Sequence, residues 1–141
     1  MLSAYPACFY KEKENGYSVI FPDLNHLATC GDTLENALTM AIDCLAGYLH
    51  TAKIDNEVVP VPSDIKTINI DSEYSDYEEA FINIVTVDVA EYAKIHFEKS
   101  IKKSLTIPKW LNDTAISRGI NFSKVLQSAL IKELQLTDLH E

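Results

Sequence analysis

Residues 5–21 read YPACFYKEKENGYSVIF, in which two apolar runs flank a polar segment. The polar segment ends in Asn15-Gly16, a pair that is typical of a tight β-hairpin turn. Aromatic and β-branched residues are frequent in both runs, and they alternate with other residues in the second. Residues 5–10 and 17–21 are therefore predicted to form two antiparallel strands of a sheet with one buried face.

A third strand and a long helix are predicted to follow this hairpin. The third strand covers residues 27–30, and Gly31 ends it. Asp32 suits an N-cap and Glu35 stands three residues later, which is the spacing of a capping box. Apolar residues then recur with the helical period, at Leu34, Ala37, Leu38, Ala41, Ile42, Leu45, Tyr48 and Leu49. This stripe predicts a helix that packs on the sheet.

The rest of the acidic part of the chain completes one domain. Residues 53–64 contain two prolines and are predicted to be an exposed connection, and residues 66–77 predict an irregular strand and a turn. Residues 81–89, FINIVTVDV, predict a strong strand, and residues 89–97 predict a short connecting helix. The order β-β-β-α-β predicts an α+β domain over residues 1–98, with one sheet and a helix on one of its faces.

Charge is distributed unevenly along the chain, whose net charge is −9. Residues 1–98 hold 5 Lys and 17 Asp or Glu and so carry −12. Residues 99–141 hold 7 Lys or Arg and 4 Asp or Glu and so carry +3. An acidic domain suits a basic partner, whereas a basic domain suits nucleic-acid phosphate. The alternative is that both are ordinary solvated surfaces.

Cysteine usage and hydropathy predict a cytoplasmic protein. Cys8, Cys30 and Cys44 form no CxxC pair, which favours free thiols over a zinc site or disulfides. No apolar run approaches the roughly 18 residues that a membrane helix needs. The first residues also lack the basic and apolar regions of a secretory signal, so we expect no membrane partner.

The basic part of the chain begins with an alternating segment. Residues 100–107 read SIKKSLTI and predict a strand. Its apolar face consists of Ile101, Leu105 and Ile107, interrupted by Lys103. Its polar face consists of Lys102, Ser104 and Thr106.

Two short helices are predicted after this strand. Pro108 suits the first turn of a helix over residues 109–118, and Gly119 suits the position that stops it. Asn121 or Ser123 caps the second helix. The apolar stripe of that helix is Phe122, Val125, Leu126, Ala129, Leu130 and Leu134. The basic domain, residues 99–141, is thus predicted to be a strand followed by two helices.

A lone strand beside two short helices cannot bury its apolar face, because the unit is small and has no disulfide or metal set. Antiparallel pairing of the strands from two copies solves this problem, so we expect a homodimer, or a higher oligomer if the acidic domains also pair. The outer face of the ribbon then carries Lys102, Ser104 and Thr106 twice. A two-stranded ribbon fits the major groove of DNA, and the free N–H groups at the start of the second helix suit a phosphate.

The segments KKSLTIPKWL and RGINFSKVL resemble the ribbon-helix-helix family of DNA-binding proteins. The resemblance implies that Lys102, Ser104 and Thr106 contact bases. It also implies that the turn before the second helix contacts a phosphate through its backbone N–H groups, here those of Asn121, Phe122 and Ser123. The alternative is a helical hairpin whose β-arm serves dimerisation alone.

Three further runs, GYSVIFPDL, TCGDTLENALTMA and YEEAFINIVTVDV, are similar to the signature of the HicB family. HicB proteins are antitoxins of type II toxin–antitoxin pairs. Asn25-His26-Leu27 departs from the pattern, because many relatives have Pro-Gly-Cys there. The resemblance implies a partial RNase H-like fold without nuclease activity over residues 1–98. It implies two partners: HicA, a small basic toxin that cleaves mRNA, bound by residues 1–98, and the operon's own operator DNA, bound and repressed by residues 99–141.

Two other function classes stay open beside this one. The first is a stand-alone ribbon-helix-helix repressor without a toxin. The second is a metal-dependent RNase H-like nuclease, for which Asp23, Asp43 and Asp88 are the candidate carboxylates. The 4 His are scattered, and the sequence has neither a GxSxG motif nor a Gly-rich phosphate loop. We therefore expect no enzyme activity, no catalytic residue, no metal site and no cofactor.

Tyr74 and Tyr77 lie in a stretch rich in Asp and Glu. Tyrosine and carboxylate groups together complement arginine, so this stretch is either a docking surface for arginines of the toxin or a solvated loop.

Overall fold

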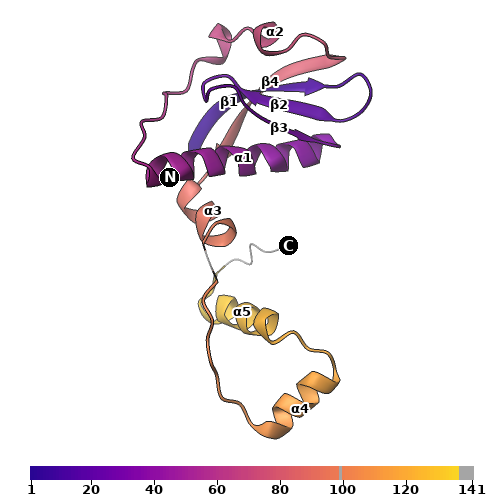
Figure 1. The fold of residues 1–141 in the computed structure, drawn as a ribbon, viewed down its shortest axis with the longest axis vertical. Helices are drawn as coiled ribbons and strands as arrows, with labels where there is room; N and C mark the ends of the chain where they lie inside the picture. The colour runs from indigo at the N-terminus through magenta and orange to yellow at the C-terminus, as the bar shows by residue number, and fades with distance from the viewer. Residues whose placement is uncertain (99, 137–141) are drawn as a thin grey trace. The chain divides into compact units, whose positions relative to one another are not determined.

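The computed structural model describes residues 1–98 and 100–136 (Figure 1). The chain forms two compact units, of which the first is residues 1–98 and the second begins after Glu98. None of the helices in the described part of the chain is long and apolar enough to cross a membrane.

The first unit is built on a four-stranded antiparallel sheet with the order β3-β2-β1-β4. Its strands are β1 (Ser3–Lys11), β2 (Tyr17–Phe21), β3 (Leu27–Gly31) and β4 (Glu79–Val87). Cys8 pairs with Ile20 across the hairpin, and β1 pairs with β4 along its whole length. The predicted hairpin and third strand are confirmed. Gly16 adopts a φ of +88° in the turn, a conformation that few other residues tolerate.

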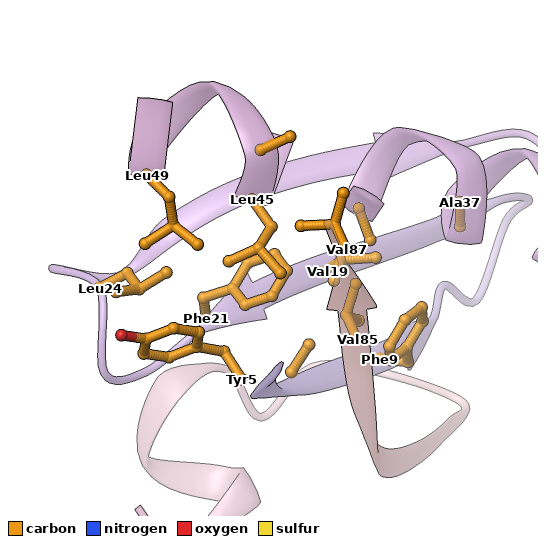
Figure 2. Close-up of a cluster of buried hydrophobic side chains, with 13 residues drawn as sticks. Tyr5, Phe9, Val19, Phe21, Leu24, Ala37, Leu45, Leu49, Val85 and Val87 are labelled. Atoms are coloured by element: carbon orange, nitrogen blue, oxygen red, sulfur yellow. The ribbon is translucent and has the colours of Figure 1, made fainter. Parts of the chain in front are cut away.

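Helix α1 (Leu34–Ile54) packs on one face of this sheet (Figure 1). Figure 2 shows how side chains from β1, β2 and β4 meet the inner face of the helix. Phe9, Val19, Phe21 and Leu45 are 0% exposed. Full burial of a side chain of this size contributes roughly 1.5–3 kcal/mol, so this layer is the main source of the unit's stability. The predicted α+β class and the packing of the helix on the sheet are confirmed.

The N-terminus of α1 corrects one prediction. Thr33, and not Asp32, is the N-cap: its hydroxyl accepts a 3.1 Å hydrogen bond from the N–H of Asn36. In return, the side-chain oxygen of Asn36 accepts a 3.1 Å bond from the N–H of Asp32. This resembles a capping box moved by one residue, except that Asn36 accepts from the residue before the cap and not from the cap itself, and Glu35 takes no part in it. The extended backbone of Thr33, at φ −125° and ψ 168°, is the physical reason.

Residues 64–77 form a cover over the opposite face of the sheet, and the strand predicted within residues 66–77 is wrong. This segment contains the 3-10 helix η1 (Ile65–Thr67) and the short helix α2 (Ile70–Glu73). Asp64 and Asn69 cap them, because their side chains offer the backbone local hydrogen bonds that compete with strand pairing.

The contact between this cover and the sheet is centred on Tyr10, which is completely buried. Its hydroxyl donates a 2.6 Å hydrogen bond to the carbonyl of Ile70. The rings of Tyr74 and Tyr77 pack against the Tyr10 ring with centroids 5.3 and 5.4 Å away. Figure 1 shows α1 and α2 on opposite sides of the sheet. The strand β1 is therefore buried on both of its faces.

The connecting helix α3 (Val89–His96) follows β4, as predicted, but the boundary lies earlier than expected. The strand ends at Val87 because Asp88 is the N-cap of α3 and accepts a 3.2 Å bond from the N–H of Glu91. The hydroxyl of Tyr92 donates a 2.8 Å bond to Asp43 on α1. This bond holds α3 against α1 within the first unit.

The second unit contains α4 (Lys109–Ser117) and α5 (Phe122–Glu133), the two helices that were predicted. Pro108 is the N-cap residue of α4 and lies outside its first turn, because its ψ of 143° is not helical. Gly119 has a φ of +66° after the end of α4, as its predicted role requires. Asn121 caps α5 by accepting a 3.1 Å bond from the N–H of Lys124, so Ser123 is not the cap.

The strand predicted over residues 100–107 does not form in the single chain. Residues 100–108 have no regular secondary structure. A strand is stabilised by hydrogen bonds to a neighbouring strand, and the described part of this unit has none to offer.

Candidate functional site

The three residues predicted to read DNA lie in the segment 100–108 that precedes α4. Lys102, Ser104 and Thr106 are all exposed. The apolar residues that alternate with them are exposed as well, to 84% for Ile101 and 65% for Leu105. The segment thus presents both of its predicted faces to solvent in the single chain, and the roles of these three side chains stay a prediction.

The turn before α5 carries the residues predicted to contact phosphate. The side-chain oxygen of Asn121 accepts a hydrogen bond from the N–H of Lys124. Among the described residues, the N–H groups of Phe122 and Ser123 have no hydrogen-bond partner. These two donors at the positive end of the helix dipole are therefore available to an anion. The cap uses the side chain of Asn121 and not its backbone N–H, so the predicted phosphate contact of all three N–H groups stays a prediction.

The second unit has no buried residue within 100–136. Its largest side chain, that of Trp110, is 69% exposed, and Val125 and Leu130 on α5 are 55% and 50% exposed. Helices with this composition gain their stability by burying an apolar face, so the unit needs a partner surface to be stable.

The first unit holds an acidic surface around the start of β4. From Asp71 to Glu91 the sequence has seven acidic residues and no Lys or Arg. Tyr74 donates a 2.8 Å hydrogen bond to Glu12, and Tyr77 donates to Asp71. Hydrogen bonding to these carboxylates raises the pKa of both tyrosines.

These tyrosines also pack on Tyr10, so part of their role is structural. The hydroxyl of Tyr77 already holds Asp71, one of the carboxylates that the arginine-docking hypothesis would offer to a partner. A hollow of about 370 Å³ nevertheless lies beside Tyr74, lined also by Glu12, Lys13, Glu14, Asn15 and Asp76. The sequence indicated the acidic stretch but not its contact with the β1–β2 turn, because the two are more than fifty residues apart.

The three carboxylates considered for a metal nuclease each have a separate structural partner. Asp23 accepts hydrogen bonds from the N–H and hydroxyl of Ser63, at 2.8 and 2.5 Å. Asp43 accepts from Tyr92, and Asp88 caps α3. The N-terminal ammonium group, 3.0 Å from Asp88, lowers the pKa of that carboxyl. Residues 1–98 and 100–136 contain no group of three or more His, Cys, Asp or Glu side chains placed to hold a metal ion.

All three cysteines are free, as predicted. Burial raises the pKa of the Cys8 and Cys44 thiols, which keeps them protonated at neutral pH. Cys44 lies beside a hollow of about 410 Å³ between α1 and Phe97. No sequence signal pointed to this hollow, because it forms only when the end of α3 folds back on α1.

Comparison with known proteins places the chain in a family. Residues 5–133 match the HicB-like antitoxin of bacterial toxin–antitoxin systems. The chain therefore belongs to the HicB-like antitoxin family, as the sequence resemblance predicted. Antitoxins are in general not enzymes, which is consistent with the expectation drawn from the sequence.

Individual relatives agree with this assignment. The chain is 41% identical over 61 residues to antitoxin HicB 1 of Photorhabdus laumondii, covering 43% of this chain and 39% of the relative. It is 33% identical over 63 residues to antitoxin HicB of Escherichia coli, covering 45% and 46%. The matched region thus spans less than half the length of these antitoxins.

A solved structure extends the similarity along the chain. A protein from a toxin–antitoxin complex of Streptococcus pneumoniae is 32% identical, with a TM-score of 0.60. The match covers 94% of this chain and 99% of the pneumococcal one. The similarity to this protein therefore extends over both units of the chain.

Proposed function

We propose that the chain neutralises a small, basic, HicA-like toxin that cleaves mRNA, and that it represses its own operon by binding operator DNA. The observation that carries this proposal is the division of the chain. A folded unit with a charge of −12 precedes a unit with a charge of +3 that has no buried residue among those described. The first suits a basic protein partner, and the second suits DNA together with a second copy of itself.

The first unit is the toxin-binding part of the proposal. We interpret its β-β-β-α-β order as a partial RNase H-like fold without nuclease activity, because Asp23, Asp43 and Asp88 each serve a different structural contact. The pneumococcal neighbour, which occurs in a toxin–antitoxin complex, supports a toxin as the partner. Binding covers the active site of the toxin and blocks its access to mRNA in the cytoplasm.

The second unit is the DNA-binding part. In a homodimer, residues 100–107 of two copies pair as antiparallel strands, which supplies the hydrogen bonds that the single chain lacks. The exposed apolar side chains of this segment and of α4 and α5 are then buried between the copies. A higher oligomer would require contacts between first units strong enough to overcome the repulsion of their charges.

The outer face of this ribbon recognises the bases. Lys102, Ser104 and Thr106 enter the major groove, where lysine reads guanine acceptors and the hydroxyls accept or donate. The N–H groups of Asn121, Phe122 and Ser123 hold a backbone phosphate, and the side chain of Asn121 caps the helix that presents them. The unit is thus proposed to be a ribbon-helix-helix domain.

The DNA-binding half is tested by fluorescence anisotropy with the chain's own promoter DNA at several salt concentrations. A variant with Lys102→Ala, Ser104→Ala and Thr106→Ala is expected to lose selective binding. A variant with Lys53→Ala, which changes an exposed lysine of the first unit, is the matched control and should bind normally. Selective binding that survives the triple substitution contradicts the groove-facing ribbon.

The toxin-binding half is tested by co-expression with the protein encoded by the neighbouring gene. That protein alone is expected to arrest growth, and co-expression is expected to restore growth and to yield a purified complex. Selective DNA binding without any toxin that the chain neutralises would instead establish a stand-alone repressor.

A further inference from the structure

The strand β4 forms one edge of the sheet, and within residues 1–98 and 100–136 no strand pairs with its outer side. The order β3-β2-β1-β4 gives it a single neighbour, β1. It has nine residues, whereas the opposite edge strand, β3, has five. Five of the nine residues are exposed, including Phe81 at 39% and Ile84 at 40%. A long, open edge of this kind is a template for another strand.

The register shows which backbone groups of β4 point outward. Glu12 donates a 3.0 Å bond to the carbonyl of Gly16, which continues the ladder between β1 and β2. The backbone N–H and C=O groups of even-numbered residues of β1 therefore point toward β2, and those of odd-numbered residues point toward β4. The odd-numbered residues of β1 pair with odd-numbered residues of β4.

It follows that the even-numbered residues of β4 direct their N–H and C=O groups away from the sheet. These residues are Ala80, Ile82, Ile84 and Thr86. The N–H of Ile84 agrees, because it donates a 3.0 Å bond to the side chain of its neighbour Asn83 and not to β1. Pro6 pairs with Ile84 and is even-numbered, so its backbone groups point away from β4. Its missing N–H therefore costs no hydrogen bond between β1 and β4.

After Glu79, the edge lacks the charged side chains and prolines that usually protect an exposed strand. Between Ala80 and Val87 it contains no charged residue and no proline. Acidic residues stand at both ends: Glu78 and Glu79 at the start of the strand, and Asp88 and Glu91 after it. An uncharged edge between acidic ends suits a strand that is itself basic at its ends.

The same charges disfavour a second copy of this chain on the edge. Antiparallel pairing of β4 with itself, centred on Asn83, places Glu78 of one copy opposite Asp88 of the other at both ends of the ladder. Like charges directly opposite one another are destabilising. The two first units, at −12 each, also repel one another as wholes.

We propose that β4 is the docking edge for the basic toxin, which adds an extended strand to the sheet antiparallel or parallel to β4. This inference rests on the proposed antitoxin function and names the surface that performs it. Main-chain hydrogen bonds to the even-numbered residues supply affinity, and the flanking carboxylates select a basic partner.

The test uses the full chain, isotope-labelled, alone and in complex with the basic protein encoded by the neighbouring gene. Residue-resolved amide hydrogen exchange should show slow exchange at Ala80, Ile82 and Thr86 in the complex and fast exchange in the free chain. Thr86→Pro removes one outward N–H without breaking the ladder to β1, and it should weaken the complex roughly tenfold. Thr86→Val keeps the N–H and the shape of the side chain, so it is the matched control and should bind as the original does.

Each outcome has a separate meaning. A complex in which these amides still exchange fast overturns the edge assignment and leaves the antitoxin function intact. Failure to form any complex overturns both proposals. Protection that appears in the free chain as its concentration rises places a second copy on the edge and also overturns the assignment. A thermal melt of the Thr86→Pro variant that matches the original shows that weakened binding is not caused by unfolding.

Discussion

The phenol of Tyr92 on α3 donates a 2.8 Å hydrogen bond to the carboxylate of Asp43 on α1. This contact joins the last helix of the first unit to its central helix. Tyr92→Phe removes the bond without removing the ring, so it should lower the free energy of unfolding by about 1 kcal/mol in urea denaturation. Tyr17→Phe is the control, because Tyr17 is half-buried and its hydroxyl has no hydrogen-bond partner among the described residues. Equal effects of the two substitutions would contradict a specific role for the bond.

The same tyrosine predicts a loss of stability at alkaline pH. Burial, together with the hydrogen bond to Asp43, raises the pKa of Tyr92 to about 12 from 10.0. Between pH 10 and 12 the unfolded chain therefore releases this proton while the folded chain retains it, so stability falls as pH rises. Urea denaturation across this range should show a shallower fall in Tyr92→Phe than in the original. An unchanged slope would mean that Tyr92 titrates normally.

The corrected cap of α1 predicts different costs for two adjacent substitutions. Thr33→Ala removes the hydroxyl that accepts from Asn36 and should cost about 1 kcal/mol of stability. Asp32→Ala keeps the backbone N–H that donates to the side chain of Asn36. It should therefore lower the free energy of unfolding by no more than about 0.5 kcal/mol. Thermal or urea denaturation of the two variants compares them directly. A larger cost for Asp32→Ala would restore Asp32 as the cap.

The core layer between α1 and the sheet predicts a larger effect. Leu45 is completely buried, whereas Ile54 at the end of the same helix is 65% exposed. Leu45→Ala should lower the free energy of unfolding by roughly 2–5 kcal/mol, because it removes transfer energy and leaves a cavity. Ile54→Ala should change it by less than about 1 kcal/mol. Similar values for both would show that α1 does not pack as Figure 2 depicts.

The proposed ribbon predicts how salt affects operator binding. Lys102→Ala should weaken binding to the operator and reduce the dependence of log K on log salt by about one ion. Lys103→Ala removes the same charge from the other face of the segment and should change selectivity less. Anisotropy titrations at a series of salt concentrations measure both effects. If Lys102→Ala changes neither the affinity nor the salt dependence, Lys102 does not face the DNA.

Local patterns in the sequence determined most elements of the first unit. The Asn15-Gly16 pair and the flanking apolar runs predicted the β1–β2 hairpin, because the turn and the alternation both act over a few residues. The period of apolar residues predicted α1 for the same reason. The two helices of the second unit and the turn at Gly119 were likewise predicted from local chemistry.

Boundaries that depend on competing hydrogen bonds were predicted less well. Asp32 and Thr33 both suit an N-cap, and only the backbone conformation at Thr33 decides between them. Residues 64–77 lack a clear period, and their structure depends on caps at Asp64 and Asn69 and on the contact with Tyr10. Asp88 ends β4 because it caps α3, which a strand pattern alone does not indicate.

The sequence alone determined the kinds of surface this protein has: an acidic domain, a basic tail and the family signature that joins them. Only the tertiary structure decided where the partners of distant groups lie. It separates Asp23, Asp43 and Asp88 into different contacts, and it leaves β4 at an open edge of the sheet. The physical reason is that charge and period are properties of neighbouring residues, whereas strand order and carboxylate partners depend on segments that meet only after the chain has folded.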